Sequence, residues 1–274
     1  MRKLALTNWA VGTLAVAGLA IAAQVHPTAL AQEADLPDLG GEALSIGSDT
    51  AYPPFEFVNE EDEIVGFDVE MFDAICEQVN CTATFQTAGF DGIFAALAAG
   101  EYDAVASAVT ITEERARVVD FSRPYLNAGQ VVTVPTNSSA DGVDALKDKT
   151  IGVQLGTTGD LEASNYTSDD NVKRYQTIDL AMAALAQGDI DGVIADAPTS
   201  ADIIAKEFSD ELKIVGEPFT TEFYGIAIQK STPEMTEAFD AAIAALIEDG
   251  TLAEIAEKWG LPTSAVENLP ESGL

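Results

Sequence analysis

Three polar groups lie just past short apolar segments that have the composition of β-strands. Asp49 follows one such segment, Thr110 and Arg115 follow a second, and Asp196 follows a third. Open α/β sheets bind ligands at the carboxyl ends of their strands, so we expect these side chains to face one site. A fourth group is the loop 156–158, Gly-Thr-Thr, whose free backbone N–H groups before a helix can receive an anion. This loop lacks the Lys and the spacing of a nucleotide P-loop.

The pairing of an arginine with an opposed aspartate suggests what that site binds. The planar guanidinium of Arg115 can hold a carboxylate through two parallel charge-assisted hydrogen bonds, and Asp196 opposite it would take an ammonium. Such an arrangement is a receptor for an α-amino acid. Two alternatives remain open from spacing alone. Arg115 could pair at the surface with Glu113, Glu114 or Asp120, and Asp196 could serve only as a helix N-cap.

The charge of the chain excludes several classes of partner. Lys and Arg number 13 against 46 Asp and Glu, which gives a formal net charge of −33. A general nucleic-acid binder needs a basic face for phosphates, and anionic lipid would repel this surface. Acidic surfaces with few Lys are typical of proteins kept soluble in high salt, and a specific cationic partner is the alternative. With 274 residues, 47% of them hydrophobic, the chain can bury a core in one or two domains.

The first residues have the pattern of an export signal. Arg2 and Lys3 precede an apolar run of 15 residues, which is too short to span a bilayer comfortably. An Ala-Leu-Ala sequence ending at Ala31 then supplies a small-x-small cleavage site. We predict a secretory signal at residues 1–31, cut after Ala31, and a periplasmic location. An uncleaved membrane anchor is the alternative.

Export and cleavage would leave a chain with no histidine, because His26 is the only one. A Ser-His-Asp triad, a Cys-His pair and an imidazole metal site are then excluded, and we expect no cofactor and no metal. Cys76 and Cys81 remain, five residues apart. In an exported protein they are expected to form a local disulfide that ties a helix end to the next strand. A reactive thiol, the alternative, would lack a His to activate it.

The remaining chain alternates between strand and helix patterns. Residues 43–47 and 103–107 have strand composition, and a helix from 67 to 79 carries regularly spaced apolar residues. We expect Asp91 to cap a second helix that ends at Gly100. Strands separated by helices of this length predict α/β layers.

An internal sequence similarity indicates two α/β units. Residues 95–105 resemble residues 183–193 at an offset of 88, and both segments predict a helix, a glycine stop, an acidic turn and a strand. Two α/β lobes built on one plan would leave a cleft between them, where small ligands bind. The last helices, predicted at 232–249 and 252–259, have no lobe of their own and are expected to return to the first lobe.

Several motifs in order resemble one family. These are Gly47–Phe57 (GSDTAYPPFEF), Gly66–Met71 (GFDVEM), Thr110–Arg115 (TITEER), Val119–Ser122 (VDFS), Gln154–Thr158 (QLGTT), Ala195–Pro198 (ADAP), Gly250-Thr251 and Lys258-Trp259. Together they run from about residue 44 to 260 and look like the blocks of periplasmic amino-acid-binding proteins of ABC importers, the family 3 extracellular solute-binding proteins.

The resemblance implies an α/β fold with two lobes that close on one ligand. Each lobe is a mixed sheet flanked by helices, and two crossover strands near 125–129 and 220–224 form the hinge. The implied division is a signal peptide at 1–31, a mobile lead-in at 32–41, lobe 1 at 42–126 and 223–266, lobe 2 at 127–222, and a C-terminal tail at 267–274.

The resemblance also assigns roles to residues. The carboxylate-binding arginine of the family falls on Arg115, helped by Thr110 and the backbone at Thr158, and the acid for the α-ammonium falls on Asp196. The acid that reads the ligand side chain falls on Asp49. The aromatic residues that pack on the ligand fall on Tyr52 and Phe90. The full predicted ligand-binding set is Asp49, Tyr52, Phe90, Ser107, Thr110, Arg115, Gln154, Thr157, Thr158 and Asp196.

Two features limit which amino acid the site is expected to bind. Glutamine binders of this family carry a Lys where Gln154 stands, which argues against glutamine. Ala108 replaces the Ser or Gly of relatives, so fewer side-chain donors line the pocket. Asp49, Asp196 and Arg115 together carry one negative charge, which a cationic ligand side chain would neutralise. We expect Arg, Lys or ornithine, with His and other polar amino acids next, delivered by a monomer to an ABC permease.

Two other classes of function compete with this interpretation. Periplasmic dehydratases that act on cyclic carboxylic acids resemble the family and also need an Arg, together with a general acid of tuned pKa. Glu222 or Asp196 could be that acid, but no pattern singles either out, so we expect no enzyme. A ligand sensor that acts through a partner receptor is the second rival.

The charge yields the first testable expectation. Acidic groups repel one another most strongly at low ionic strength, where the Debye length is about 30 Å at 0.01 M salt against about 3 Å at 1 M. We expect the Tm of the purified protein to rise steeply from low to molar NaCl in calorimetry. A flat response would mean that the acids are already compensated, for example by bound divalent cations.

Overall fold

The structure is a computed structural model, and it describes residues 36–274. The expected signal sequence and its cleavage site after Ala31 lie outside the described residues. Within that part of the chain, none of the helices combines the length and the hydropathy that a membrane crossing requires.

The first lobe is built on a five-stranded sheet. Its strands, in spatial order, are β5 (Cys81–Thr87), β1 (Glu42–Ser48), β6 (Ala104–Val105), β15 (Ala227–Ile228) and β7 (Asp120–Phe121). The first three are parallel, and β15 runs antiparallel to both β6 and β7. The sheet is therefore mixed, and its fourth strand comes from a segment far along the chain.

The second lobe has a sheet of the same size made from one continuous stretch. Its strands, in spatial order, are β11 (Val172–Tyr175), β10 (Ile151–Gln154), β12 (Gly192–Asp196), β9 (Gln130–Pro135) and β13 (Leu212–Val215). Again the first three are parallel and the fourth, β9, is antiparallel to its neighbours. Both lobes thus share the order of their three parallel strands, in which the first of the three along the chain lies between the second and the third.

The internal sequence similarity between residues 95–105 and 183–193 corresponds to equivalent positions in the two lobes. Helix α2 (Ile93–Ala99) ends at Gly100 with φ 82°, and helix α4 (Ile178–Gln187) ends at Gly188 with φ 83°. Only glycine adopts this left-handed conformation without strain, and its N–H then caps carbonyls of the last helical turn. Each glycine leads the chain into the third parallel strand of its sheet, so the similarity in the sequence reflects equivalent positions.

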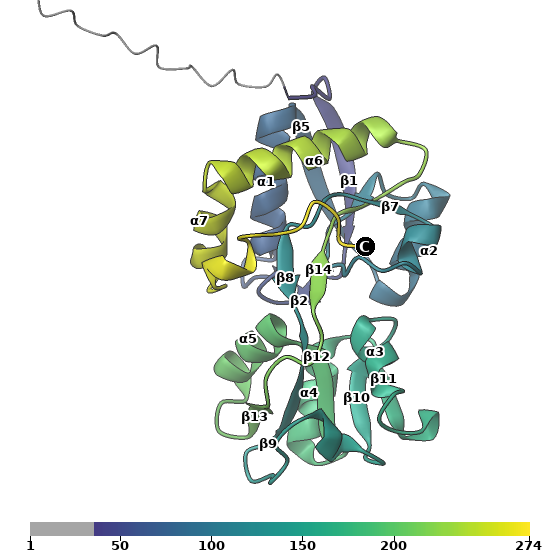
Figure 1. Ribbon diagram of the computed structural model, residues 1–274, viewed down its shortest axis with the longest axis vertical. Helices are drawn as coiled ribbons and strands as arrows, with labels where there is room; N and C mark the ends of the chain where they lie inside the picture. The colour runs from purple at the N-terminus through teal and green to yellow at the C-terminus, as the bar shows by residue number, and fades with distance from the viewer. Residues whose placement is uncertain (1–35) are drawn as a thin grey trace, which may run out of the picture. The chain divides into compact units, whose positions relative to one another are not determined.

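The remaining helices cover the sheets. They are α1 (Phe67–Val79), α3 (Thr158–Ala163), α5 (Ala197–Glu207), α6 (Pro233–Glu248) and α7 (Thr251–Lys258), with short 3-10 turns at Phe90–Gly92, Arg115–Arg117, Val143–Leu146, Asp169–Asn171 and Thr263–Ala265. Helices α6 and α7 pack against α1, on the first lobe (Figure 1). The edge-to-face pair of Phe72 and Phe239, with ring centroids 5.2 Å apart, joins α1 to α6.

Two short strands connect the sheets. β8 (Leu126–Ala128) and β14 (Glu222–Tyr224) pair antiparallel, and Figure 1 draws them side by side. Tyr125 and Tyr224 at this pair are fully buried, with ring centroids 6.2 Å apart, and Phe67 stacks on Tyr125. The connection is therefore anchored in an aromatic cluster of the first lobe.

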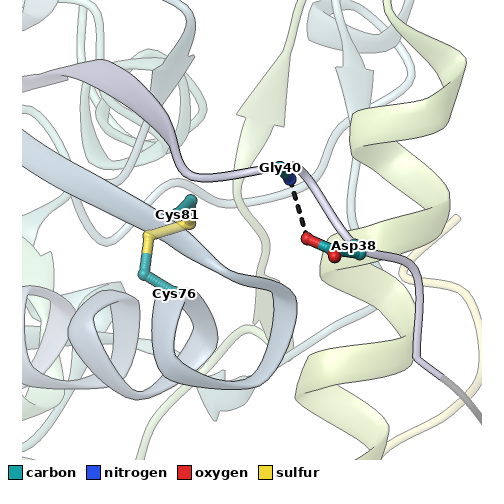
Figure 2. The surroundings of a disulfide bond; sticks show 4 residues. All are labelled: Asp38, Gly40, Cys76 and Cys81. Carbon is teal, nitrogen blue, oxygen red and sulfur yellow. Dashed lines mark hydrogen bonds between the residues drawn. A yellow bond between two sulfur atoms is a disulfide. The ribbon is translucent and has the colours of Figure 1, made fainter.

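The two cysteines form a disulfide, as their spacing predicts. Cys76 lies in the last turn of α1 and Cys81 opens β5, so the bond closes the turn between helix and strand (Figure 2). The segment before β1 reaches the same turn. Asp38 accepts hydrogen bonds from Gly40 N at 2.7 Å and from Asn80 Nδ2 at 2.8 Å.

One helix start differs from the expectation. Asp91 does not cap α2, because it lies inside the 3-10 turn and the helix begins at Ile93 after Gly92. The preceding turn takes the place of a side-chain cap. Phe90 is buried as a result, with its ring held edge-on against Phe94.

Gly66 sets the position of α1 against a small sheet of β2 (Ala51–Tyr52), β3 (Glu56–Val58) and β4 (Ile64–Val65). The first helical N–H groups, of Phe67 and Asp68, donate to the carbonyls of Pro54 and Phe55. This close approach requires Gly66, which has φ 144° and whose added Cβ would lie 2.0 Å from the carbonyl oxygen of Phe55.

We therefore expect Gly66→Ala to destabilise the fold by about 3 kcal/mol or more, because both backbone strain and backbone overlap oppose it. Urea unfolding measures the change. Gly92→Ala is the control, since a Cβ there meets nothing within 4 Å and φ is −105°. It should stay within about 0.5 kcal/mol of the parent. Equal losses in both variants would contradict the assigned role of Gly66.

Candidate functional site

Polar and charged side chains from both lobes line one cavity. The strand ends of β6 and its following loop supply Ser107, Thr110 and Arg115, while β10 and β12 end in Gln154 and Asp196. The cavity has a volume of about 10 Å³, which is roughly the room needed by one water molecule. It is lined by Tyr52, Phe90, Ser107, Ala108, Thr110, Arg115, Gln154, Thr157, Thr158 and Asp196.

Asp49 stands immediately behind this lining, past the end of β1. Its carboxylate accepts a hydrogen bond from Gln154 Nε2, which joins the two lobes, and its backbone N–H donates to Ser107 Oγ at 2.9 Å. Burial raises the pKa of Asp49 to about 6, against the lowering effect of the Gln154 hydrogen bond, and the charge of Asp179 raises it further. The acid thus sits where a cationic group would stabilise its charged form.

Asp196 is held by two side chains and makes no cap bond to its helix. Tyr52 Oη donates to one carboxylate oxygen and Gln130 Nε2, at 2.6 Å, donates to the other. Although Asp196 precedes α5, its side chain accepts no backbone N–H there. Burial raises its pKa to about 7, and the negative charge of Glu222 adds to the rise, while Tyr52 and Arg115 oppose it.

Arg115 is the cation of the site. Its guanidinium lies over the rings of Phe90 and Phe94, with Cζ 5.3 Å and 4.8 Å from their centroids. Its two terminal nitrogens donate to the backbone carbonyls of Thr110 at 2.7 Å and Gly156 at 3.2 Å. The 3-10 turn that begins at Arg115 aims the side chain inward, away from the acids that could have paired with it at the surface. Burial lowers its pKa to about 10, and the charges of Glu222 and Asp196 counteract this.

The threonines of the site converge on Glu222. Thr110 Oγ1 at 2.6 Å and Thr158 Oγ1 at 2.8 Å both donate to Glu222 Oε2. Thr157 has a local role instead, since its hydroxyl caps α3 by accepting from Asp160 N and donates to the Gln154 carbonyl. The Thr158 hydroxyl, in turn, accepts from Gln130 Nε2 at 3.2 Å.

Two further acids, Glu56 and Asp68, form hydrogen bonds with residues that line the cavity. Glu56 and Asp68 are fully buried. Ser107 Oγ donates to Glu56 at 2.8 Å, and Asp68 accepts from Ala108 N at 2.8 Å and from Tyr125 Oη at 2.9 Å. Burial raises the pKa of Asp68 to about 7, while hydrogen bonding opposes this rise. Asp68 thereby links the cavity lining, where Ala108 has φ 45°, to the start of the connection between lobes.

The structure brings together nine of the ten predicted ligand-binding residues as lining and places the tenth, Asp49, in contact with two of them. Sequence reasoning did not find Gln130, and it considered Glu222 only as an acid for a rival enzyme. Both come from segments that connect the lobes rather than from the ends of parallel strands. Ala108 joins the lining as well, through its backbone position.

Metal binding finds no support in the described residues. Within 36–274, no three His, Cys, Asp or Glu side chains gather in the way that would hold an ion. The acids of the site instead accept hydrogen bonds from hydroxyl and amide groups, and their charge faces one guanidinium.

Comparisons with known proteins place the chain in a family. The family model described as bacterial extracellular solute-binding proteins, family 3, matches residues 44–262. The arginine-binding periplasmic protein of Mannheimia haemolytica is 33% identical over 219 residues, 78% of this chain and 90% of that protein. A probable histidine-binding protein of Neisseria gonorrhoeae is 32% identical over 223 residues, 80% of this chain and 83% of that protein.

Solved structures agree with these relatives. An ancestral arginine-binding protein bound to arginine has a TM-score of 0.75 and 37% identity, and the match covers 79% of this chain and 97% of that one. An arginine-, lysine-, histidine-binding protein from Geobacillus stearothermophilus has a TM-score of 0.75 and 33% identity, with 79% and 94% covered. The family model alone spans most of the described residues, and the fold and the relatives agree with it. The chain therefore belongs to the bacterial extracellular solute-binding proteins, family 3.

Proposed function

We propose that this protein binds one free α-amino acid with a basic side chain between its two lobes and delivers it to an ABC permease. A single observation carries the proposal: one cavity presents a guanidinium, Arg115, and an aspartate, Asp196, from different lobes. A zwitterion needs these two opposite charges within one site. Relatives named for binding arginine, lysine or histidine support the same class of ligand.

The charge balance of the site favours a cationic side chain. The charges of the buried Asp196 and Glu222 act on Arg115, and Asp49 is buried against Gln154 of the same cavity lining, so three carboxylates share the site with one guanidinium. An α-amino acid contributes a carboxylate and an ammonium that cancel each other. A positively charged side chain adds the cation that this cluster lacks, whereas an acidic one would add a further buried negative charge.

The far end of the site supplies acceptors for that cation. Asp49 carries a carboxylate, and the neighbouring Gln154 Oε1 is buried without a hydrogen-bond partner in the described residues. A guanidinium offers five N–H donors and an ammonium three, so either could satisfy these oxygens. Tyr52 and Phe90 provide apolar surface for the methylene groups between the two ends.

The wider role follows from this binding. Lobe 1, taken as residues 42–126 with 223–266, and lobe 2, taken as 127–222, would close on the ligand by bending at β8 and β14. We infer that the mature protein starts after Ala31, works as a monomer in the periplasm, and acts as a receptor rather than as an enzyme. The family membership supports the periplasmic location and the ABC importer partnership.

Calorimetric titration with arginine, lysine, ornithine and histidine tests the function. The parent should bind at least one of them, and Arg115→Ala should weaken that binding by about 2–5 kcal/mol because the ligand carboxylate loses its charge-assisted partner. Arg117→Ala is the matched control, since Arg117 belongs to the same 3-10 turn but is exposed. Binding by Arg115→Ala within threefold of the parent would refute the role of Arg115.

Substitution of Asp196 and substitution of Asp49 should affect ligand binding in different ways. Asp196→Asn should weaken every amino acid alike, because all of them share the α-ammonium. Asp49→Asn should weaken arginine far more than citrulline, its neutral analogue, because only the cation loses a charge-assisted bond. Calorimetric titration of both variants with both ligands gives the ratio of the arginine affinity to the citrulline affinity. An unchanged arginine-to-citrulline ratio in Asp49→Asn, with lowered stability alone, would leave Asp49 as a structural residue.

A further inference from the structure

Glu222 is a buried acid that adds to the charge of the site but has no assigned contact with the ligand in the proposed function. It is the first residue of β14, on the second connection between the lobes, and only 6% of its surface is exposed. Oε2 accepts the hydroxyls of Thr110 and Thr158, and Oε1 accepts the hydroxyl of Thr220 at 3.0 Å. Thr110 follows β6 of the first lobe and Thr158 opens α3 of the second, so one oxygen atom joins both lobes.

The hydroxyls that Glu222 engages belong to the part of the site that surrounds Arg115. Each threonine has a single hydroxyl proton, and while both point at Glu222 they offer only lone pairs to the cavity. The negative charge of Glu222 also acts on the guanidinium, as it helps to sustain the pKa of Arg115 against burial. Glu222 therefore interacts with the donors and the cation that an incoming carboxylate would need.

We propose that Glu222 is an affinity-limiting residue that competes with the α-carboxylate of the ligand for the Thr110 and Thr158 hydroxyls and for the field of Arg115. This inference rests on the proposed function. Glu222 accepts both hydroxyls, and its negative charge acts on Arg115. A ligand carboxylate must then bind beside a like charge and share or displace its hydrogen bonds, which lowers affinity and favours release.

The competition depends on the α-carboxylate of the ligand. A ligand without that group therefore distinguishes competition by Glu222 from a purely structural role of Glu222. Agmatine is arginine without its carboxylate, so it keeps the amine and the guanidinium but brings no negative charge toward Glu222. For agmatine the charge of Glu222 is attractive, whereas for the carboxylate of arginine it is repulsive. Removing that charge should thus move the two affinities in opposite directions.

The experiment titrates arginine and agmatine into the full mature protein and its Glu222→Gln variant. Gln keeps an oxygen that accepts both threonine hydroxyls while it removes the charge. We expect arginine to bind at least tenfold more tightly to the variant and to dissociate more slowly, and agmatine to bind equally or more weakly. The arginine-to-agmatine affinity ratio should therefore rise at least tenfold.

Controls separate the possible failures. Glu217→Gln removes an exposed charge shortly before β14 and should leave the ratio unchanged. Glu222→Ala frees both hydroxyls and should raise the ratio as well, at a cost in Tm. Equal loss of both ligands in the Glu222 variants, or failure of both variants to fold, would overturn the proposal and leave Glu222 as a structural residue. If the parent bound none of the basic amino acids, the proposed function itself would fail.

Discussion

The site is governed by the burial of several carboxylates around very few cations. Asp49, Asp196 and Glu222 line or back the cavity, Glu56 and Asp68 lie beneath it, and Arg115 is the cation among them. A buried carboxylate is costly unless hydrogen bonds or opposite charges compensate it. Tyr, Ser, Thr and Gln side chains from both lobes supply the hydrogen bonds, but they bring no positive charge. The site is therefore arranged to gain from a cation, which would oppose the rise that burial causes in the pKa values of Asp49 and Asp196.

Much of the fold was predictable because local signals and tertiary packing agree. Helices with apolar spacing and a glycine stop, such as α2 and α4, appear where the sequence places them. Strands β11 and β13 escaped prediction, since each has only four residues and only the first residue of each is buried. Residues 224–228 are divided between the connection and the first sheet, since β14 ends at Tyr224 and β15 begins at Ala227.

For the site, position after a parallel strand proved the informative signal. Asp49 and Asp196 follow from topology, since the carboxyl ends of parallel strands meet at one edge. Glu222 and Gln130 could not be found in this way, because they lie on or beside the connections and reach the site only through the bend of the chain. No local pattern distinguishes such an acid from the many acids at the surface of this chain. The roles of all these residues in binding stay predictions.

The sheet topology bears on the order in which the two lobes can be completed during folding. The second sheet uses residues 130–215 alone, so it can form as soon as that stretch is available. The first sheet must wait, because β15 inserts between β6 and β7 and pairs Ala227 with Val105 and Phe121. Closing that distant contact is entropically easier once the intervening chain has compacted. The lobe that begins earlier in the polypeptide is thus the one completed later, and β6 and β7 lack the strand that pairs with both of them in the interval.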